Sequence, residues 1–213
     1  MAVTQGMLPS PPGAGAGGIP ARAIPRYGLR FLRADGVSPI LGPVNESGDS
    51  AVGALQSGID ANMDLYRQLT QLVAALDAAG VEYALCGGLA MAVHSLPRAT
   101  VDIDVMIEPS ALDAVRRVAK GLGYDMDIGP MTFAGGRVRI HRLTMIDHEH
   151  GDVLPLDLLL VTPEVEAVWE SRVKVQWEAG HLWVVSRAGL IELKRLRGSG
   201  QDHDDIRRLE EKP

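Results

Sequence analysis

The sequence predicts a mixed α/β domain of the α+β kind, in which helices and strands alternate along the chain. Three observations support this class. Apolar residues recur at helical spacing over residues 65–76, they alternate at strand spacing over 101–107, and further runs of both kinds follow as far as residue 211. We therefore expect one domain that spans residues 59–213.

The first helix is predicted from its apolar period. Apolar residues stand at i, i+4, i+7, i+8 and i+11 from Leu65, which is one face of a helix that Gly80 can end. Residues 81–86 have the composition of a strand. Residues 89–96 predict a short helix that stops before a proline.

The next strand, predicted over residues 101–107, carries two acidic residues. Asp102 and Asp104 alternate with apolar side chains, so both should lie on the face opposite to those side chains. The apolar face is expected to comprise Val101, Ile103, Val105 and Ile107. Ser110 and Asp113 then resemble a capping box and predict the start of a helix.

The second half of the domain continues the alternation of strands and helices. Strands are predicted at residues 137–146, 153–161, 173–177 and 182–185, and helices near 164–171, 187–197 and 202–211.

Residues 1–58 differ from the rest of the chain in composition. Proline, glycine, alanine and serine dominate runs such as residues 10–20, and no apolar period is sustained. Such a segment buries too little apolar surface to offset the entropy that ordering costs. The sequence therefore predicts a disordered or low-complexity segment at 1–58.

The composition of the chain argues against several classes of function. A net charge of −6 argues against bulk electrostatic binding of nucleic acid, and 4% aromatic residues are too few for base-stacking platforms. The single cysteine excludes an internal disulfide and fits a reducing cytoplasm. No run approaches the length of apolar sequence that spans a membrane. We expect a cytoplasmic protein without a membrane partner.

The pair Asp102 and Asp104 indicates chemistry on phosphates. Carboxylates two residues apart on a strand lie on one face, about 6.6 Å from each other along the strand. Gly87 and Gly88 form a turn before a helix, where backbone N–H groups can face an anion. Carboxylates beside such a turn can hold a divalent metal next to phosphates. The pattern favours phosphoryl or nucleotidyl transfer.

Asp157 is the third acidic residue of interest. It lies in a strand-like run of apolar residues, where a charge is costly unless it is paired, hydrogen-bonded or bound to a metal. A strand aspartate bonded to backbone groups would explain this residue alone, and a solvated strand face would explain the other two. The order of glycine turn, short helix, D-x-D strand and later strand aspartate favours a shared site.

This combination resembles the nucleotidyltransferase superfamily with the DNA polymerase β-like fold. The motifs are Cys86-Gly87-Gly88, Asp102-Ile103-Asp104-Val105 and Leu156-Asp157-Leu158. The stretch from Gly87 to Asp104, and the ending with Lys194, Asp202 and Asp205, are similar to minimal bacterial nucleotidyltransferases, including abortive-infection type toxins. The resemblance covers about residues 60–211. It implies a mixed sheet with helices packed mainly on one face and short C-terminal helices.

The resemblance also implies the roles of the site residues. Asp102, Asp104 and Asp157 would be the catalytic residues and the ligands of Mg²⁺ in a two-metal site. Gly87, Gly88, Arg98 and Lys194 would bind the nucleotide. Gly88 stands where many members carry a serine.

The expected activity is Mg²⁺-dependent transfer of a nucleotidyl group from an NTP, ATP among them, to an acceptor hydroxyl. Two classes of acceptor remain as alternatives: RNA, as in toxin–antitoxin systems, and a small hydroxylated molecule such as an aminoglycoside. An antitoxin protein is a further partner that the resemblance implies. Two other readings remain: a catalytically silent member that binds a nucleotide or a partner, and an α/β module whose aspartates are coincidental.

Overall fold

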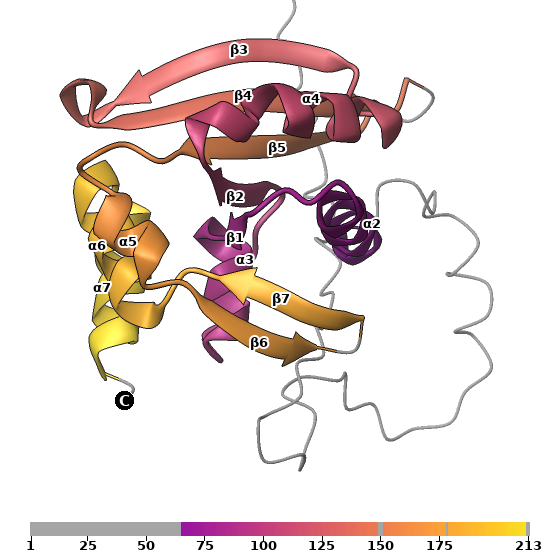
Figure 1. Ribbon diagram of the computed structural model, residues 1–213. Coiled ribbons are helices and arrows are strands. Elements are labelled where there is room, and N and C mark those ends of the chain that lie inside the picture. Colours follow the sequence, from indigo (N-terminus) through magenta and orange to yellow (C-terminus); the bar gives the residue numbers. More distant parts are fainter. Residues whose placement is uncertain (1–64, 149–150, 178, 212–213) are drawn as a thin grey trace, which may run out of the picture.

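The computed structural model describes residues 65–148, 151–177 and 179–211. The predicted low-complexity segment at 1–58 and the first residues of the predicted domain lie outside these ranges. Within them the chain forms a mixed sheet and a set of α-helices (Figure 1). The mixed α/β class that the sequence predicts is confirmed.

The described residues place seven strands in one sheet, in the order β3-β4-β5-β2-β1-β7-β6. The strands are β1 (Ala84–Leu85), β2 (Ile103–Ile107), β3 (Met126–Phe133), β4 (Val138–Ile146), β5 (Val153–Leu160), β6 (Val173–Trp177) and β7 (Gly180–Val184). The pairs β2·β5 and β1·β7 are parallel and the other neighbours are antiparallel. The sheet is therefore mixed, as expected.

Six α-helices accompany this sheet in the described part of the chain. They are α2 (Leu65–Ala78), α3 (Gly87–Val93), α4 (Leu112–Gly121), α5 (Glu166–Glu170), α6 (Arg187–Arg197) and α7 (Gly200–Glu211). Helix α2 buries the face that the apolar period predicts, and the chain turns after it at Gly80, whose φ is +64°. Helices α2 and α4 contact each other, while α5, α6 and α7 form a second group (Figure 1).

Helix α6 has clear signals at both ends. The side chain of Ser186 accepts a hydrogen bond from the backbone N–H of Gly189, and Gly198 ends the helix with a φ of +66°. Leu190 and Lys194 of this helix are buried. The two caps therefore fix which residues of α6 face the interior.

Two local predictions about strand β2 and helix α4 are wrong. Val101 is 65% exposed, because the strand begins only at Ile103 and the preceding residues approach it irregularly. The capping box is absent, because α4 follows a 3-10 turn at Pro109–Ala111 and its first turn receives no side-chain cap. The remaining apolar residues of β2 are fully buried, so the predicted face itself is correct.

Strand β3 is missing from the sequence prediction. It contains Gly129 and Pro130, which weaken a strand pattern, and a bulge lies between Asp127 and Gly129. The sheet order explains why proline is tolerated, because β3 is an edge strand.

No helix among the described residues has the length and apolar character that crossing a membrane requires.

Candidate functional site

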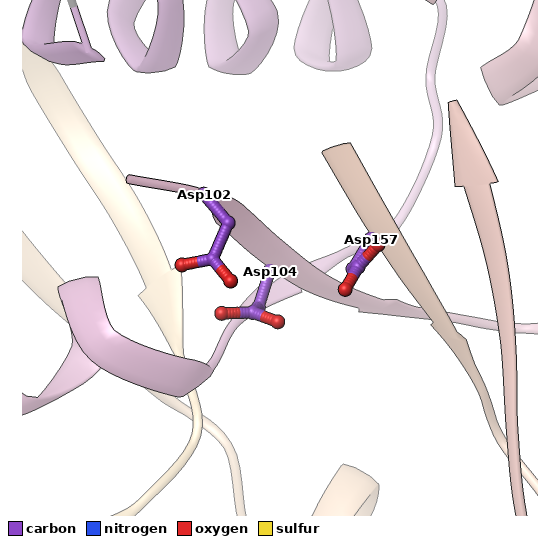
Figure 2. A group of neighbouring side chains, drawn as sticks. All are labelled: Asp102, Asp104 and Asp157. Atoms are coloured by element: carbon purple, nitrogen blue, oxygen red, sulfur yellow. The ribbon is translucent and has the colours of Figure 1, made fainter. Parts of the chain in front are cut away.

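The register of the sheet brings two of the predicted aspartates face to face. Strands β2 and β5 are parallel neighbours, and Asp104 pairs directly with Asp157. Paired residues of adjacent strands point to the same face, so both carboxylates lie on one side of the sheet. Asp102, just before β2, extends to that side as well (Figure 2).

The three aspartates form a cluster of oxygen ligands. One carboxylate oxygen from each of Asp102, Asp104 and Asp157 lies within 4.8 Å of the others. Carboxylate oxygens are the ligands that Mg²⁺ and Ca²⁺ take in proteins. The donor set therefore fits a divalent cation, and the structure brings together the residues that the sequence singled out.

The glycine pair at the start of α3 lies against this cluster. A Cβ atom on Gly87 would fall 1.8 Å from Asp104 Oδ2, and the φ of Gly87 is +62°. A Cβ atom on Gly88 would fall 2.4 Å from the hydroxyl oxygen of Thr100. Only a residue without a side chain fits at either position, so the backbone comes close to the carboxylates.

Thr100 holds the first aspartate in place. Its hydroxyl donates a hydrogen bond of 2.5 Å to Asp102 Oδ1. A hydroxyl bonded to a carboxylate is a charge-assisted contact, which is shorter and stronger than a neutral one. The same hydroxyl fills the space beside Gly88, so Thr100 links the glycine turn to the cluster.

Arg142 of strand β4 is a residue of this site that the sequence interpretation missed. Its Nε donates to Asp157 Oδ1 at 2.6 Å and its Nη2 donates to Asp157 Oδ2 at 2.6 Å. The two residues are direct cross-strand partners in the antiparallel pair β4·β5. Only the register of two strands could have revealed this pair.

Burial and the neighbouring carboxylates change the protonation of Asp104. Burial, followed by the charges of Asp102 and Asp157, raises the pKa of Asp104 to about 7. Burial, followed by the charge of Asp104, also raises the pKa of the Cys86 thiol. Without a cation both the protonated and the ionised form of Asp104 are therefore populated around neutral pH.

The aspartates face a cleft between the sheet and helix α6. Asp104 and Asp157 line it on the sheet side, and Lys194 and Arg197 line it on the helix side. The other lining residues are Cys86, Gly87, Val138, Ile140, Leu159, Leu190 and Leu193. The lining is thus mostly apolar, with two acidic and two basic side chains.

Lys194 and Arg98, the two predicted nucleotide-binding cations, meet at one carboxylate. Lys194 Nζ donates to Asp205 Oδ2 at 2.6 Å, and Arg98 Nε donates to the same oxygen at 3.0 Å. The side chain of Lys194 is 4% exposed, so it is an interior cation and not a solvated charge at the end of α6. Arg98 ties the segment before β2 to helix α7.

Helix α7 supplies a second buried carboxylate, Asp202. Arg197 donates to both of its oxygens, at 2.7 and 2.6 Å, and the hydroxyl of Ser199 donates at 2.6 Å. Burial opposes ionisation here, but the hydrogen bonds from Arg197 and Ser199 hold the pKa of Asp202 well below its usual range. Asp202, Asp205 and the buried Leu209 lie on one inward face of α7, and both aspartates belong to the C-terminal stretch that the sequence resemblance includes.

Comparison with known proteins gives matches at the level of structure alone. No family model and no curated protein sequence matches the chain. A candidate nucleotidyltransferase from Thermotoga maritima, TM1012, aligns with a TM-score of 0.47 and 12% identity over 70% of this chain and 93% of its own. The protein ANT(2″)-Ia, solved in complex with adenylyl-2″-tobramycin, aligns with a TM-score of 0.48 and 14% identity over 67% of this chain and 85% of its own.

A third similar structure is JHP933 from Helicobacter pylori, with a TM-score of 0.43 and 14% identity over 72% of this chain and 68% of its own. At identities of 12–14% and TM-scores below 0.5, the chemistry of this chain must be argued from its own residues.

Proposed function

We propose that the protein is a metal-dependent nucleotidyltransferase, which moves a nucleotidyl group from an NTP to an acceptor hydroxyl. The observation that carries this proposal is the cluster of Asp102, Asp104 and Asp157, with oxygens within 4.8 Å of one another beside the Gly87 turn. The sequence resemblance to the nucleotidyltransferase superfamily supports the same activity.

In this proposal Asp102 and Asp104 hold Mg²⁺, and Asp157 completes a second metal position. Bound metal would neutralise the triphosphate and the charge that develops on the leaving pyrophosphate. Thr100 keeps Asp102 oriented toward the cluster through its hydrogen bond. Gly87 and Gly88 would allow a nucleotide to approach the backbone. Lys194 adds positive charge at the cleft, and Arg98 adds positive charge beside Gly88.

The reaction would be an in-line displacement at the α-phosphorus of the NTP. The oxygen of the acceptor hydroxyl forms a bond to that phosphorus, while the bond to the bridging oxygen of the β-phosphate breaks. Pyrophosphate leaves, and Asp157 helps to take up the hydroxyl proton. The three carboxylates thus act on the nucleotide and on the acceptor from one face of the sheet.

The acceptor is proposed only as a class. The reaction needs an acceptor hydroxyl, which an RNA 3′ end or a small hydroxylated molecule such as an aminoglycoside could supply. ATP is the first NTP to test. An antitoxin partner, a cytoplasmic location and a domain that spans residues 59–213 after a low-complexity segment remain predictions from the sequence.

A labelling experiment tests the activity. The protein is incubated with Mg²⁺ and each NTP, labelled at the α- or the γ-phosphate, in the presence of total RNA, an aminoglycoside panel or no added acceptor. We expect α-label, and no γ-label, to enter one class of acceptor. Transfer of γ-label would instead assign a phosphoryl transferase.

Matched variants connect that activity to the site. Asp104→Asn should lower transfer by about 100-fold or more, the scale on which enzymes lose rate when a group that stabilises transition-state charge is removed. Asp113→Asn changes an exposed carboxylate of α4 and should transfer like the wild type. Absence of transfer from every NTP, with retained nucleotide binding, would favour the catalytically silent alternative.

A further inference from the structure

Asp157 differs from the other two aspartates in its hydrogen-bond partner. Asp102 accepts a hydrogen bond from the neutral hydroxyl of Thr100, whereas Asp157 accepts two from the cationic guanidinium of Arg142. Both oxygens of Asp157 are engaged, each at 2.6 Å. The carboxylate that the proposed second metal position needs therefore already has a cation bound to it.

The register of the sheet positions the two residues of this contact. Arg142, Asp157 and Asp104 occupy directly paired positions on β4, β5 and β2. These three side chains therefore lie next to one another across the strands, with the guanidinium of Arg142 at one end. The two N–H donors of the guanidinium match the two oxygens of the Asp157 carboxylate. The row needs no backbone movement to form the pair.

Exposure differs between the two partners. The side chain of Asp157 is 7% exposed, while that of Arg142 is 35% exposed. An ionised carboxylate that is so deeply buried needs a compensating cation. The guanidinium of Arg142 can exchange this contact for hydrogen bonds to water, whereas the carboxylate of Asp157 is buried and cannot turn to solvent.

We propose that Arg142 acts as a built-in cation that competes with the divalent metal for Asp157, and so sets how tightly the aspartate cluster binds metal. This inference rests on the proposed metal-dependent function. In the metal-free protein Arg142 balances the charge of Asp157. When metal binds, the guanidinium gives up at least one of its two bonds to Asp157 and turns toward solvent.

Metal affinity in the absence of nucleotide tests this competition. Binding of Mn²⁺ is measured by electron paramagnetic resonance at pH 8 for the full chain. Arg142→Met keeps the length of the side chain and removes its charge, and it should lower the Kd for Mn²⁺ about tenfold or more, in keeping with the loss of a competing charge-assisted contact. Arg142→Lys replaces the fork with a single point charge and should give an intermediate Kd.

Two controls isolate the contact to Asp157. Arg139→Met removes an exposed arginine from the opposite face of the same strand and should leave the Kd unchanged. In an Asp157→Asn background, Arg142→Met should have a much smaller effect on the Kd, because the carboxylate that Arg142 bonds directly is gone and only its longer-range interaction with Asp102 and Asp104 remains.

Thermal unfolding provides a second readout. Without metal, Arg142→Met should melt below the wild type, since it leaves Asp157 without its counter-ion. Saturating Mg²⁺ should raise the melting temperature of this variant more than that of the wild type, because ligand stabilisation grows as Kd falls.

The outcomes separate this inference from the proposed function. If the wild type binds Mn²⁺ and Arg142→Met and Arg142→Lys bind it no more tightly, the competition is refuted while metal dependence stands. Equal tightening in Arg139→Met, or tightening of undiminished size in the Asp157→Asn background, would also refute it. If neither the wild type nor any variant binds Mn²⁺, the inference falls together with the metal-dependent function.

Discussion

Lys194 Nζ lies 2.6 Å from Asp205 Oδ2, and both side chains are almost completely buried, at 4% and 3% exposed. A second aspartate, Asp202, lies 3.5 Å from the same ammonium group. The basic residue that sequence reasoning assigned to a phosphate is thus also the centre of an ion cluster between α6 and α7. Its structural role and its proposed role in nucleotide binding have to be measured separately.

Replacement of Lys194 should destabilise the fold strongly. Lys194→Ala leaves Asp205 paired with Arg98 and removes a neighbour of Asp202, and loss of one partner from a buried ion pair costs about 3–5 kcal/mol. Urea unfolding of the variant measures this loss. Arg195→Ala removes an exposed cation of the same helix and should cost less than about 1 kcal/mol.

Equal losses in the two variants would contradict the interior role of Lys194. Nucleotide affinity is then compared at a temperature where Lys194→Ala is folded. A weaker affinity under those conditions would support the predicted contact to phosphate.

Addition of a methyl group at Gly87 should disable the site. The Cβ of Gly87→Ala would fall 1.8 Å from Asp104 Oδ2, and alanine is disfavoured by about 1–2 kcal/mol at the positive φ of this residue. We expect displaced Asp104, weakened Mn²⁺ binding and a lower melting temperature. Gly121→Ala is the matched control, because a Cβ there meets nothing within 4 Å and the residue is helical.

That control should be neutral or stabilising by up to about 1 kcal/mol. Wild-type metal affinity in Gly87→Ala would show that the close approach of the backbone to Asp104 is unimportant.

Removal of the hydroxyl of Thr100 should loosen Asp102. Thr100→Val is nearly isosteric but cannot donate the 2.5 Å hydrogen bond, and a bond to a charged group contributes about 1.5–3 kcal/mol. We expect Mn²⁺ binding and nucleotidyl transfer to fall about tenfold or more. Thr100→Ser keeps the hydroxyl and should therefore keep both metal binding and transfer. Equal losses in Thr100→Val and Thr100→Ser would indicate that Thr100 acts through packing and not through its hydrogen bond.

The contribution of Asp104 to the stability of the metal-free protein should fall between about pH 4 and pH 7. The fold raises the pKa of Asp104 to about 7, so the folded protein binds this proton more tightly than the unfolded chain does. The stabilisation is complete below the unfolded pKa near 4 and is lost as pH rises through 7, at up to about 1.4 kcal/mol per pH unit. Mg²⁺ should oppose the loss, because it favours the ionised carboxylate.

Urea unfolding in EDTA from pH 5 to pH 7.5 measures this dependence. The curve for Asp104→Asn should be flatter than that of the wild type, and Asp113→Asn should follow the wild type. The low pKa of Asp202 affects stability only at more acid pH, so it does not enter this window. Parallel curves for the wild type and Asp104→Asn would refute the raised pKa.

Much of the fold follows from local sequence patterns. The apolar period that begins at Leu65 defines α2, and the alternation around Asp104 defines the buried face of β2. Strand β3 escaped prediction because an edge strand tolerates Gly129 and Pro130 and buries few side chains. The capping box failed because a 3-10 turn at Pro109–Ala111 precedes α4.

The sequence alone singled out the three aspartates that cluster in the structure, because Asp102 and Asp104 are local to one strand and Asp157 lies in an apolar run. The tertiary structure decided what those groups meet. The pairing of Arg142 with Asp157 depends on the register of two strands, and the pairing of Lys194 with Asp205 depends on how α7 packs on α6. Ion pairs of this kind form when separate helices or strands pack together and bring their charged side chains into contact. The composition and the apolar period of the sequence do not show which charged residues will pair.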